Sequence, residues 1–174
     1  MKEKIKSYCN SIGIQEIGFV KCRRFDELIS FYNYRKENNL ENEFEESDIE
    51  KRINPKLYMN EGKTIISIAF PYLWNNDYVE NGFSKYTKGY DYHKVVKMHL
   101  DKICNMIIEA GGKAISLVDS NALPERYIAY LAGVGFIGKN NMIITKTHGS
   151  YVFLGEIIMS ELIRNKDLKN RVRF

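Results

Sequence analysis

The sequence predicts a single domain of the α/β (α+β) sandwich class. Two kinds of segment alternate along the chain: some carry apolar residues at the spacing of one helical face, and others are short β-branched runs typical of strands. The 174 residues are 44% hydrophobic, which is enough to bury one core without disulfide bonds. We therefore expect one folded unit in which helices pack on a sheet.

The first half of the chain predicts two helices and two strands around an acidic loop. Apolar residues fall on one helical face in residues 5–12 and again in residues 25–32. Residues 14–20 are typical of a short strand. Residues 64–70 are β-branched and nearly all apolar, which predicts a strand covered on both faces. Residues 41–50 are acidic with few apolar side chains, so we expect an exposed loop there.

The second half predicts two more helices and three strands. Apolar side chains in residues 96–107 recur at helical spacing, and Gly111 and Gly112 follow as a stop. His99 is expected at the surface or boundary of this helix. The remaining elements are a strand over residues 113–118, a helix between Pro124 and Gly133, and strands over residues 142–145 and 151–158.

Charge and cysteine content limit the class of protein. Basic residues outnumber acidic ones 26 to 22, a balance that permits a polyanionic partner without requiring one. Cys9, Cys22 and Cys104 are widely spaced and form no C-x-x-C pair, which favours reduced thiols and cannot supply the four thiolates of a cubane cluster. The charged start and the lack of any apolar run near ~18 residues argue against a signal peptide or a membrane span. We expect a cytoplasmic protein without a membrane partner.

A long polar loop between residues 71 and 92 is rich in aromatic side chains. Loops of this length are commonly functional or disordered, and the aromatic content is too high for a disordered linker. Either the rings stack on a planar ligand or on nucleobases, or they pack the loop down. The aromatic residues of the loop are Tyr72, Trp74, Tyr78, Phe83, Tyr86, Tyr90 and Tyr92.

Residues 118–156 combine glycines, an acid and a lysine without a helical or strand period, which is typical of a segment that holds a ligand. Asp119 follows a predicted strand and precedes a helix, a place where open sheets commonly bind ligands. Asp119 could instead cap that helix, although Ser120 and Asn121 lie closer to its start. A carboxyl buried there in an apolar pocket would have a raised pKa, as a general acid requires.

The glycine pattern at residues 133–138 would let the chain approach a flat or bulky partner closely. It matches G-x-G-x-x-G but follows a helix rather than a strand, so the dinucleotide fingerprint fails. His93 and His99 lack the spacing and the further ligands of a metal motif, and we expect no metal site. Glu125 and Arg126 are expected only to pair with each other or with neighbours.

Six segments together carry a family resemblance. They are K-R-I-N-P-K-L at 51–57, Y-T-K-G-Y-D-Y-H-K-V at 86–95, V-D-S at 118–120, E-R at 125–126, A-G-V-G-F-I-G-K-N at 132–140 and H-G-S-Y-V-F-L-G-E at 148–156. In these elements the chain resembles the epoxyqueuosine reductase family, cobalamin-dependent iron–sulfur enzymes that finish queuosine in tRNA. Ala122 stands where the family usually has a proline, which here is Pro124. The family's C-x-x-C-x-x-C-x-x-x-C-P motifs do not occur before Phe174.

The resemblance implies a nitroreductase-like mixed sheet flanked by helices, with cobalamin as the cofactor. It also implies reduction of epoxyqueuosine to queuosine in a tRNA anticodon stem-loop, with Asp119 as the catalytic proton donor. Two iron–sulfur clusters would feed the electrons, and because their cysteines are absent from this chain, an iron–sulfur domain or another electron donor is expected as a partner. The cofactor-binding residues implied by the family register are Asp119, Lys139, Asn140, Ile143, His148, Ser150, Tyr86 and His93.

The resemblance also suggests how the chain is divided. Residues 1–162 are expected to form the cobalamin-binding catalytic domain, and the basic residues 163–174 a tail or linker toward an absent iron–sulfur domain. Such a chain is not expected to turn over alone. The alternatives are a non-enzymatic cobalamin-binding or corrinoid-handling protein and a flavin-binding nitroreductase-like protein, which a red or a yellow spectrum would distinguish.

Overall fold

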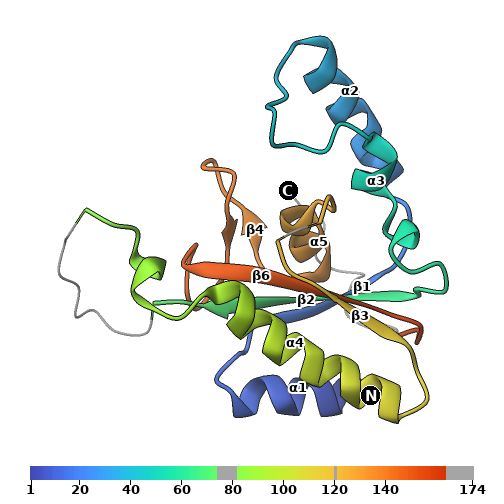
Figure 1. The fold of residues 1–174 in the computed structure, drawn as a ribbon, viewed down its shortest axis with the longest axis vertical. Coiled ribbons are helices and arrows are strands. Elements are labelled where there is room, and N and C mark those ends of the chain that lie inside the picture. Colours follow the sequence, from blue (N-terminus) through green and yellow to red (C-terminus); the bar gives the residue numbers. More distant parts are fainter. Residues whose placement is uncertain (74–81, 120, 164–174) are drawn as a thin grey trace.

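A four-stranded sheet forms the centre of the domain (Figure 1). The computed structural model describes residues 1–73, 82–119 and 121–163. The strands lie in the order β1-β2-β6-β3, so that the long strands β2 and β6 are central and the short strands β1 and β3 form the edges. Their bounds are Ile17–Lys21 for β1, Thr64–Pro71 for β2, Ala114–Leu117 for β3 and Val152–Met159 for β6.

The expectation of a mixed sheet is wrong for the described residues, because every neighbouring pair of strands in the sheet is antiparallel. β2 and β3 run in the same direction and are connected through the long helix α4 (Tyr92–Glu109), as parallel strands usually are. The last strand, β6, lies between them and runs opposite to both. This insertion replaces one parallel contact by two antiparallel ones.

Helices cover both faces of the sheet (Figure 1). Helices α4 and α1 (Lys2–Ser11) lie on one face, and α5 (Glu125–Ala132) lies on the other. On β2 the side chain of Ile66 packs into the core under α1 and α4, whereas its neighbour Ile65 packs into the core under α5. The predicted strand over residues 64–70 is therefore confirmed as covered on both faces.

The predicted helix stop at Gly133 is also confirmed. Gly133 follows α5 with φ 77°, a left-handed conformation that glycine adopts without a Cβ clash. The chain then forms a small antiparallel hairpin of β4 (Phe136–Ile137) and β5 (Ile143–Ile144) beside α5. β4 was not predicted, and the strand expected over residues 142–145 is reduced to β5.

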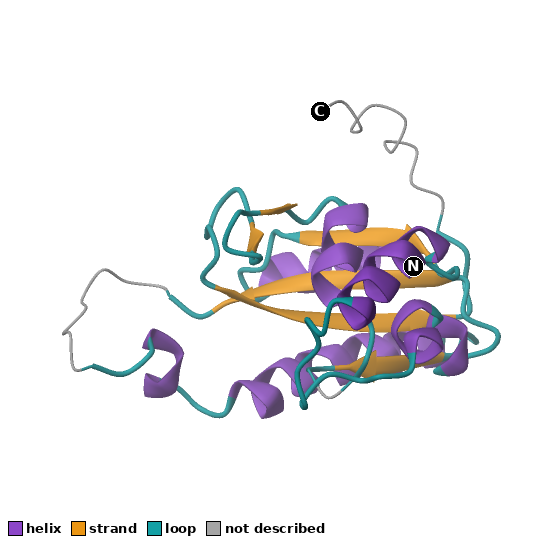
Figure 2. Ribbon diagram, turned by 90° about the horizontal axis from the view of Figure 1, so that it is seen from above, coloured by secondary structure: helices purple, strands orange, loops and turns teal. Residues whose placement is uncertain are grey.

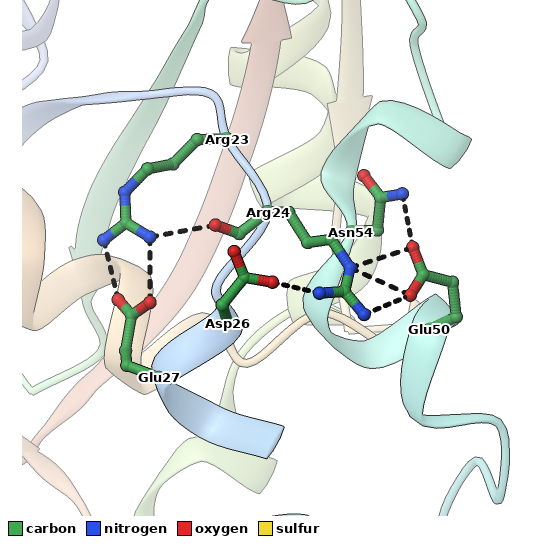
Figure 3. Close-up of polar contacts among 6 residues, drawn as sticks. All are labelled: Arg23, Arg24, Asp26, Glu27, Glu50 and Asn54. Atoms are coloured by element: carbon green, nitrogen blue, oxygen red, sulfur yellow. Dashed lines mark hydrogen bonds and ion pairs between the residues drawn. The ribbon is translucent and has the colours of Figure 1, made fainter.

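Two further helices, α2 (Ile29–Glu37) and α3 (Ile49–Ile53), project away from the sheet (Figure 1). The beginning of α3 is tied to the segment after β1 by an arginine–carboxylate contact (Figure 3). Arg24 Nε donates to the two carboxylate oxygens of Glu50 at 3.2 and 2.9 Å, and the Asn54 amide donates to the same carboxylate at 2.6 Å. These bonds hold the α2–α3 arm in place.

The acidic loop expected over residues 41–50 is only partly exposed. Glu45 has a side chain that is 19% exposed, and it accepts hydrogen bonds from Arg35 on α2 and from Arg52 on α3, the latter at 2.9 Å. Residues from Ile49 onward belong to α3. The expectation was wrong here because two arginines outside the acidic run bring the compensating charge.

The turn Lys85–Lys88, in the predicted aromatic loop, extends beyond the ends of the strands in both views (Figures 1 and 2). Within the described ranges, no helix is both long and apolar enough to cross a membrane. Cys9, Cys22 and Cys104 are buried free thiols. Burial raises the pKa of Cys9 to about 11 and that of Cys104 to about 12, so these thiols are unreactive near neutral pH.

Candidate functional site

Asp119 lies two residues beyond the edge strand β3, on the segment that leads to α5. Its backbone has φ 51°, in the left-handed region that few non-glycine residues occupy. Its Oδ2 accepts a hydrogen bond from the Tyr92 hydroxyl at 3.1 Å and lies 3.1 Å from His93 Nε2. Both partners come from the first turn of α4, so the edge strand and this helix meet at one carboxylate.

His93 lies between two carboxylates. Its Nδ1 is 2.9 Å from Oδ1 of Asp91, the residue that caps α4, while its Nε2 faces Asp119. The hydrogen bonds to Asp91 and then to Asp119 raise the pKa of His93. Burial, followed by the hydrogen bond to Asp119, raises the pKa of Tyr92 to about 12. Together, Asp91 and His93 can hold a proton next to the Asp119 carboxylate and transfer it there.

Asp119 departs from both the capping alternative and the expected burial. It does not cap α5, whose N-cap residue is Pro124 and which has no side-chain cap. Asn121 Oδ1 accepts the backbone N–H of Leu123, which precedes the helix, at 2.9 Å, and Ser120 lies outside the described residues. The Asp119 carboxyl is also not buried, since its side chain is 58% exposed. It follows an edge strand, and no other described strand covers that edge.

Aromatic rings pack against one another beside Asp119. Tyr92 stacks on Phe153 of β6 with ring centroids 3.8 Å apart and 5° between the planes, and it stacks on His93 at 3.9 Å. Tyr86 makes edge contacts with both Tyr92 and Phe153. For these rings of the aromatic loop, the structure follows the packing alternative.

Other rings of the same loop face solvent. Phe83 and Tyr90 are 69% and 91% exposed, which keeps the stacking alternative open for them. Trp74 and Tyr78 lie outside the described residues. The loop therefore has an inner set of packed rings and an outer set that a ligand can reach.

The predicted residues Lys139, Asn140 and Ile143 lie on the β4–β5 hairpin. Lys139 and Asn140 are exposed in its turn, where Asn140 Oδ1 accepts the N–H of Met142 at 3.2 Å. Ile143 is 2% exposed and packs in the core under α5. Arg126 of α5 fixes this hairpin, because its Nη1 donates to the Asn141 carbonyl at 2.8 Å.

The predicted residues His148 and Ser150 lie in the turn that leads into β6. His148 Nδ1 is 3.3 Å from Glu16 Oε2, and Glu16 Oε1 accepts the N–H of Thr147 at 3.2 Å. Glu16 is buried just before β1, so this turn is anchored to the start of the sheet. Ser150 is half-buried next to it.

The glycines of residues 133–138 have intramolecular roles, contrary to the expectation that they approach a ligand. A Cβ on Gly135 would lie 2.4 Å from the Ile144 carbonyl oxygen, and one on Gly138 would lie 2.5 Å from Ile144 Cδ1. Gly133 ends α5. The hairpin itself therefore fills the space that these glycines leave.

Two cavities of about 690 and 630 Å³ meet at the Asp119 segment. Volumes of this size are typical of small-molecule sites. The α2–α3 arm forms the opposite wall of both cavities through Glu45 and Arg52, and the second cavity continues along α5 to Arg126 and Asn141. The residues that line both are Glu45, Arg52, Asp119, Asn121, Ala122 and Leu123.

Two acids next to the site, one on α5 and one on β6, were not predicted to be functional. Glu156 on β6 is 1% exposed and accepts a hydrogen bond from the Ser67 hydroxyl at 3.4 Å. Burial, and then the charge of Glu125, raise the pKa of Glu156 well above its ordinary value. Burial, and then the charge of Asp119, raise the pKa of Glu125 to about 7. In the sequence, the signal that could have revealed Glu156 is an acidic residue inside the apolar run of β6.

His99 occupies the boundary position that was predicted for it. It is half-buried, and its Nδ1 lies 2.8 Å from the Tyr8 hydroxyl. Among the residues that the structure describes, no three His, Cys, Asp or Glu side chains are grouped for a metal ion.

The fold and the site together define a class: an α+β domain with an acid–histidine pair beside cavities of small-molecule size. Residues 52–120 of this chain match the family described as "Epoxyqueuosine reductase QueG, DUF1730". The chain is 38% identical over 168 residues to epoxyqueuosine reductase of Bacillus anthracis, a match that covers 91% of this chain and 44% of that protein.

Solved structures give the same result. Epoxyqueuosine reductase from Streptococcus thermophilus matches with a TM-score of 0.82 and 34% identity, over 94% of this chain and 47% of that one. An epoxyqueuosine reductase with a tRNA-Tyr epoxyqueuosine-modified stem loop matches with a TM-score of 0.78 and 31% identity, over 94% of this chain and 48% of that one. The chain belongs to the epoxyqueuosine reductase family, and it spans about half the length of the curated relatives that it matches.

Proposed function

We propose that this chain is a cobalamin-binding catalytic domain of the epoxyqueuosine reductase type, an oxidoreductase that converts epoxyqueuosine to queuosine in tRNA. The observation that carries the proposal is the exposed Asp119 carboxylate held by Tyr92 and His93 at the edge of two cavities. The proposed substrate and cofactor rest on membership of the family. We also propose a nitroreductase-like architecture, in which the described strands of the central sheet are antiparallel rather than mixed.

The proposed role of Asp119 follows from the chemistry of the reaction. Loss of an epoxide oxygen as water takes up two electrons and two protons, so the site needs a group that delivers a proton to that oxygen. Asp119 presents an exposed carboxyl, and His93 lies where it can restore the proton from Asp91 or from solvent. The Tyr92 hydroxyl fixes the direction of the carboxyl group.

The hairpin and the turn after it fit the chemistry of cobalamin, whose corrin face is apolar and whose rim carries amides. Exposed Lys139 and Asn140 can bond such a rim together with His148 and Ser150, while buried Ile143 supports the hairpin from below. When bound, cobalamin would supply a strongly reducing cobalt centre beside the substrate. The exposed apolar side chains available to the corrin face are Phe136, Ile137, Met142 and Tyr151.

Iron–sulfur clusters do not fit this chain. Its three cysteines are buried thiols in two different core clusters, Cys22 under α5 and Cys9 and Cys104 under α1 and α4. A cubane cluster needs four thiolates at one place. A separate electron donor or iron–sulfur domain is therefore part of the proposal.

The proposed nucleic-acid partner is a tRNA anticodon stem-loop, in the cytoplasm. The relative that was solved with a tRNA stem loop supports this partner. Arg126 is exposed and lines the second cavity together with Asp119, where it can contact a phosphate. The division into a cofactor domain over residues 1–162 and a basic linker over residues 163–174 remains a proposal, because residues after 163 lie outside the described part of the chain.

Replacing Asp119 by asparagine tests the proposed function. The full chain is loaded with cobalamin, reduced chemically and given an epoxyqueuosine-containing stem-loop, and queuosine is measured by mass spectrometry. Asp119→Asn should bind cobalamin as tightly as the wild type but form queuosine at least about 100-fold more slowly, since the amide cannot deliver a proton. Glu3→Gln, an exposed position on α1, should behave as the wild type. A wild-type rate in Asp119→Asn would contradict the proposal.

A further inference from the structure

A buried carboxylate joins the start of the sheet to the turn that leads into β6. Glu16, just before β1, is 8% exposed, and its backbone carbonyl accepts the N–H of Ala69 on β2 at 2.9 Å. Its Oε1 accepts the backbone N–H of Thr147 at 3.2 Å, and its Oε2 lies 3.3 Å from His148 Nδ1. Both oxygens of one side chain therefore reach the same turn, which is far away in the sequence.

The turn also has bonds of its own. Thr145, which is 4% exposed, donates its backbone N–H and its hydroxyl to the Gly149 carbonyl at 2.9 and 3.1 Å. The Thr145 hydroxyl oxygen accepts the backbone N–H of His148 at 3.1 Å. Gly149 has φ 58°, a left-handed conformation that glycine adopts easily. These bonds close the backbone of the turn without the help of Glu16.

The charge of Glu16 has a use at only one of its two oxygens. An anchor for the Thr147 N–H alone requires a neutral acceptor, and a carboxylate taken out of water costs free energy unless a partner offsets its charge. The partner that the structure gives to Glu16 Oε2 is His148 Nδ1, and the His148 side chain is itself only 17% exposed. The contact with the imidazole ring is therefore where the negative charge acts.

This contact fixes the place of the imidazole proton. A neutral imidazole has one N–H donor and one bare acceptor nitrogen. If Nδ1 of His148 were the bare nitrogen, its lone pair would face a carboxylate oxygen 3.3 Å away, and the two acceptors would repel each other. The favourable arrangement has the proton on Nδ1 and the lone pair on Nε2, because the partner of one ring nitrogen decides the state of the other.

We propose that Glu16 is a positioning residue for His148: it holds the ring and keeps the proton of the neutral ring on Nδ1, so that Nε2 serves as a hydrogen-bond acceptor for an N–H donor of the bound ligand. Primary amides are such donors, and under the proposed function they are the amides on the rim of cobalamin. The acceptor role toward cobalamin rests on the proposed function, whereas the effect of Glu16 on the ring does not.

The test determines which nitrogen of His148 carries the proton, by long-range proton–nitrogen NMR on the full chain without cofactor or substrate, at a pH at which the imidazole rings are neutral. In the wild type the proton should be on Nδ1. Glu16→Gln keeps a carbonyl oxygen for Thr147 and presents its amide N–H to Nδ1, so the proton should move to Nε2. His148→Gln assigns the signals, and His93 and His99 are internal references that Glu16→Gln should leave unchanged.

A proton on Nε2 of His148 in the wild type would overturn the proposal, and this result does not depend on whether any variant folds. An unchanged proton position in Glu16→Gln would overturn it as well, because a residue that only shapes the turn has no influence on the ring nitrogens. The exposed control Glu3→Gln makes the same chemical change on α1 and should keep the wild-type state of His148.

A cobalamin titration separates this proposal from the proposed function. Glu16→Gln should bind cobalamin about 2- to 10-fold more weakly than the wild type, the effect of one hydrogen bond, and Glu3→Gln should bind it equally well. Equal affinity in Glu16→Gln despite a moved proton would overturn the acceptor role of His148. If the proton follows Glu16 but the wild type binds no cobalamin, the proposed function falls and the positioning role stands. If the wild type binds cobalamin and the proton does not follow Glu16, the reverse holds.

Discussion

The stability of the domain should depend on pH through Glu125. Its pKa is raised from 4.5 to about 7, so the folded state binds a proton more tightly than the unfolded state does. The stability that this proton contributes is fully present below about pH 4.5 and is lost as the pH rises through about 7. At about 1.4 kcal/mol per pKa unit, the loss is about 3 kcal/mol.

Glu125→Gln removes this titration, because glutamine is neutral at every pH. We expect the free energy of unfolding, measured in urea, to move in favour of the variant by about 3 kcal/mol relative to the wild type between about pH 4 and pH 8. Glu156 is present in both proteins, and burial, the main cause of its raised pKa, is the same in both, so this part of its contribution cancels. The exposed control Glu3→Gln should show no such trend. A difference between Glu125→Gln and the wild type that is constant with pH would refute this reasoning.

Two further predictions concern packing and orientation. Gly18→Ala should destabilise the domain by about 1–3 kcal/mol or prevent folding, because the new Cβ would lie 2.2 Å from the Ala132 carbonyl oxygen where α5 crosses β1, and thermal unfolding would show it. Gly89→Ala, whose Cβ meets nothing closer than 4.0 Å, is the matched control, and equal effects at the two positions would contradict the packing account. Tyr92→Phe keeps the ring on Phe153 but removes the hydroxyl from Asp119, so stability should fall by no more than about 1 kcal/mol while queuosine formation slows. An unchanged rate would show that the hydroxyl does not orient the acid.

Local patterns allowed much of the fold to be predicted. The β-branched run at residues 64–70 and the helical spacing at residues 96–107 are each sufficient to define an element, and Gly133 marks a helix end because its backbone is left-handed. The insertion of β6 between β2 and β3 could not be predicted, because strand order depends on pairing between residues that are far apart in sequence. The mixed sheet was therefore the wrong expectation.

The candidate site was predicted less completely than the fold. The position of Asp119 between a strand and a helix could be predicted from the strand-like run before it and the helix start signal after it. Its exposure follows from β3 being an edge strand, which no local pattern reveals. Glu45 was expected in an exposed loop, and Glu125 was expected only to pair with Arg126 or with neighbours. The surroundings of both acids depend on contacts that no periodicity reveals. Glu45 pairs with two arginines, and Glu125 accepts a hydrogen bond from the Asn121 amide and raises the pKa of Glu156 by its charge.

Cobalamin binding tests the central claim most directly. The full chain is titrated with cobalamin while visible absorbance and thermal unfolding are recorded, with Lys139→Ala on the hairpin and Lys4→Ala on the opposite face of the sheet as a matched pair. The wild type and Lys4→Ala should show a saturable change in the corrinoid spectrum and a rise in the unfolding temperature, as any ligand of the native state requires, and Lys139→Ala should bind more weakly. A chain that gives no spectral change and no stabilisation at saturating cobalamin, or that takes up flavin instead, would contradict the account.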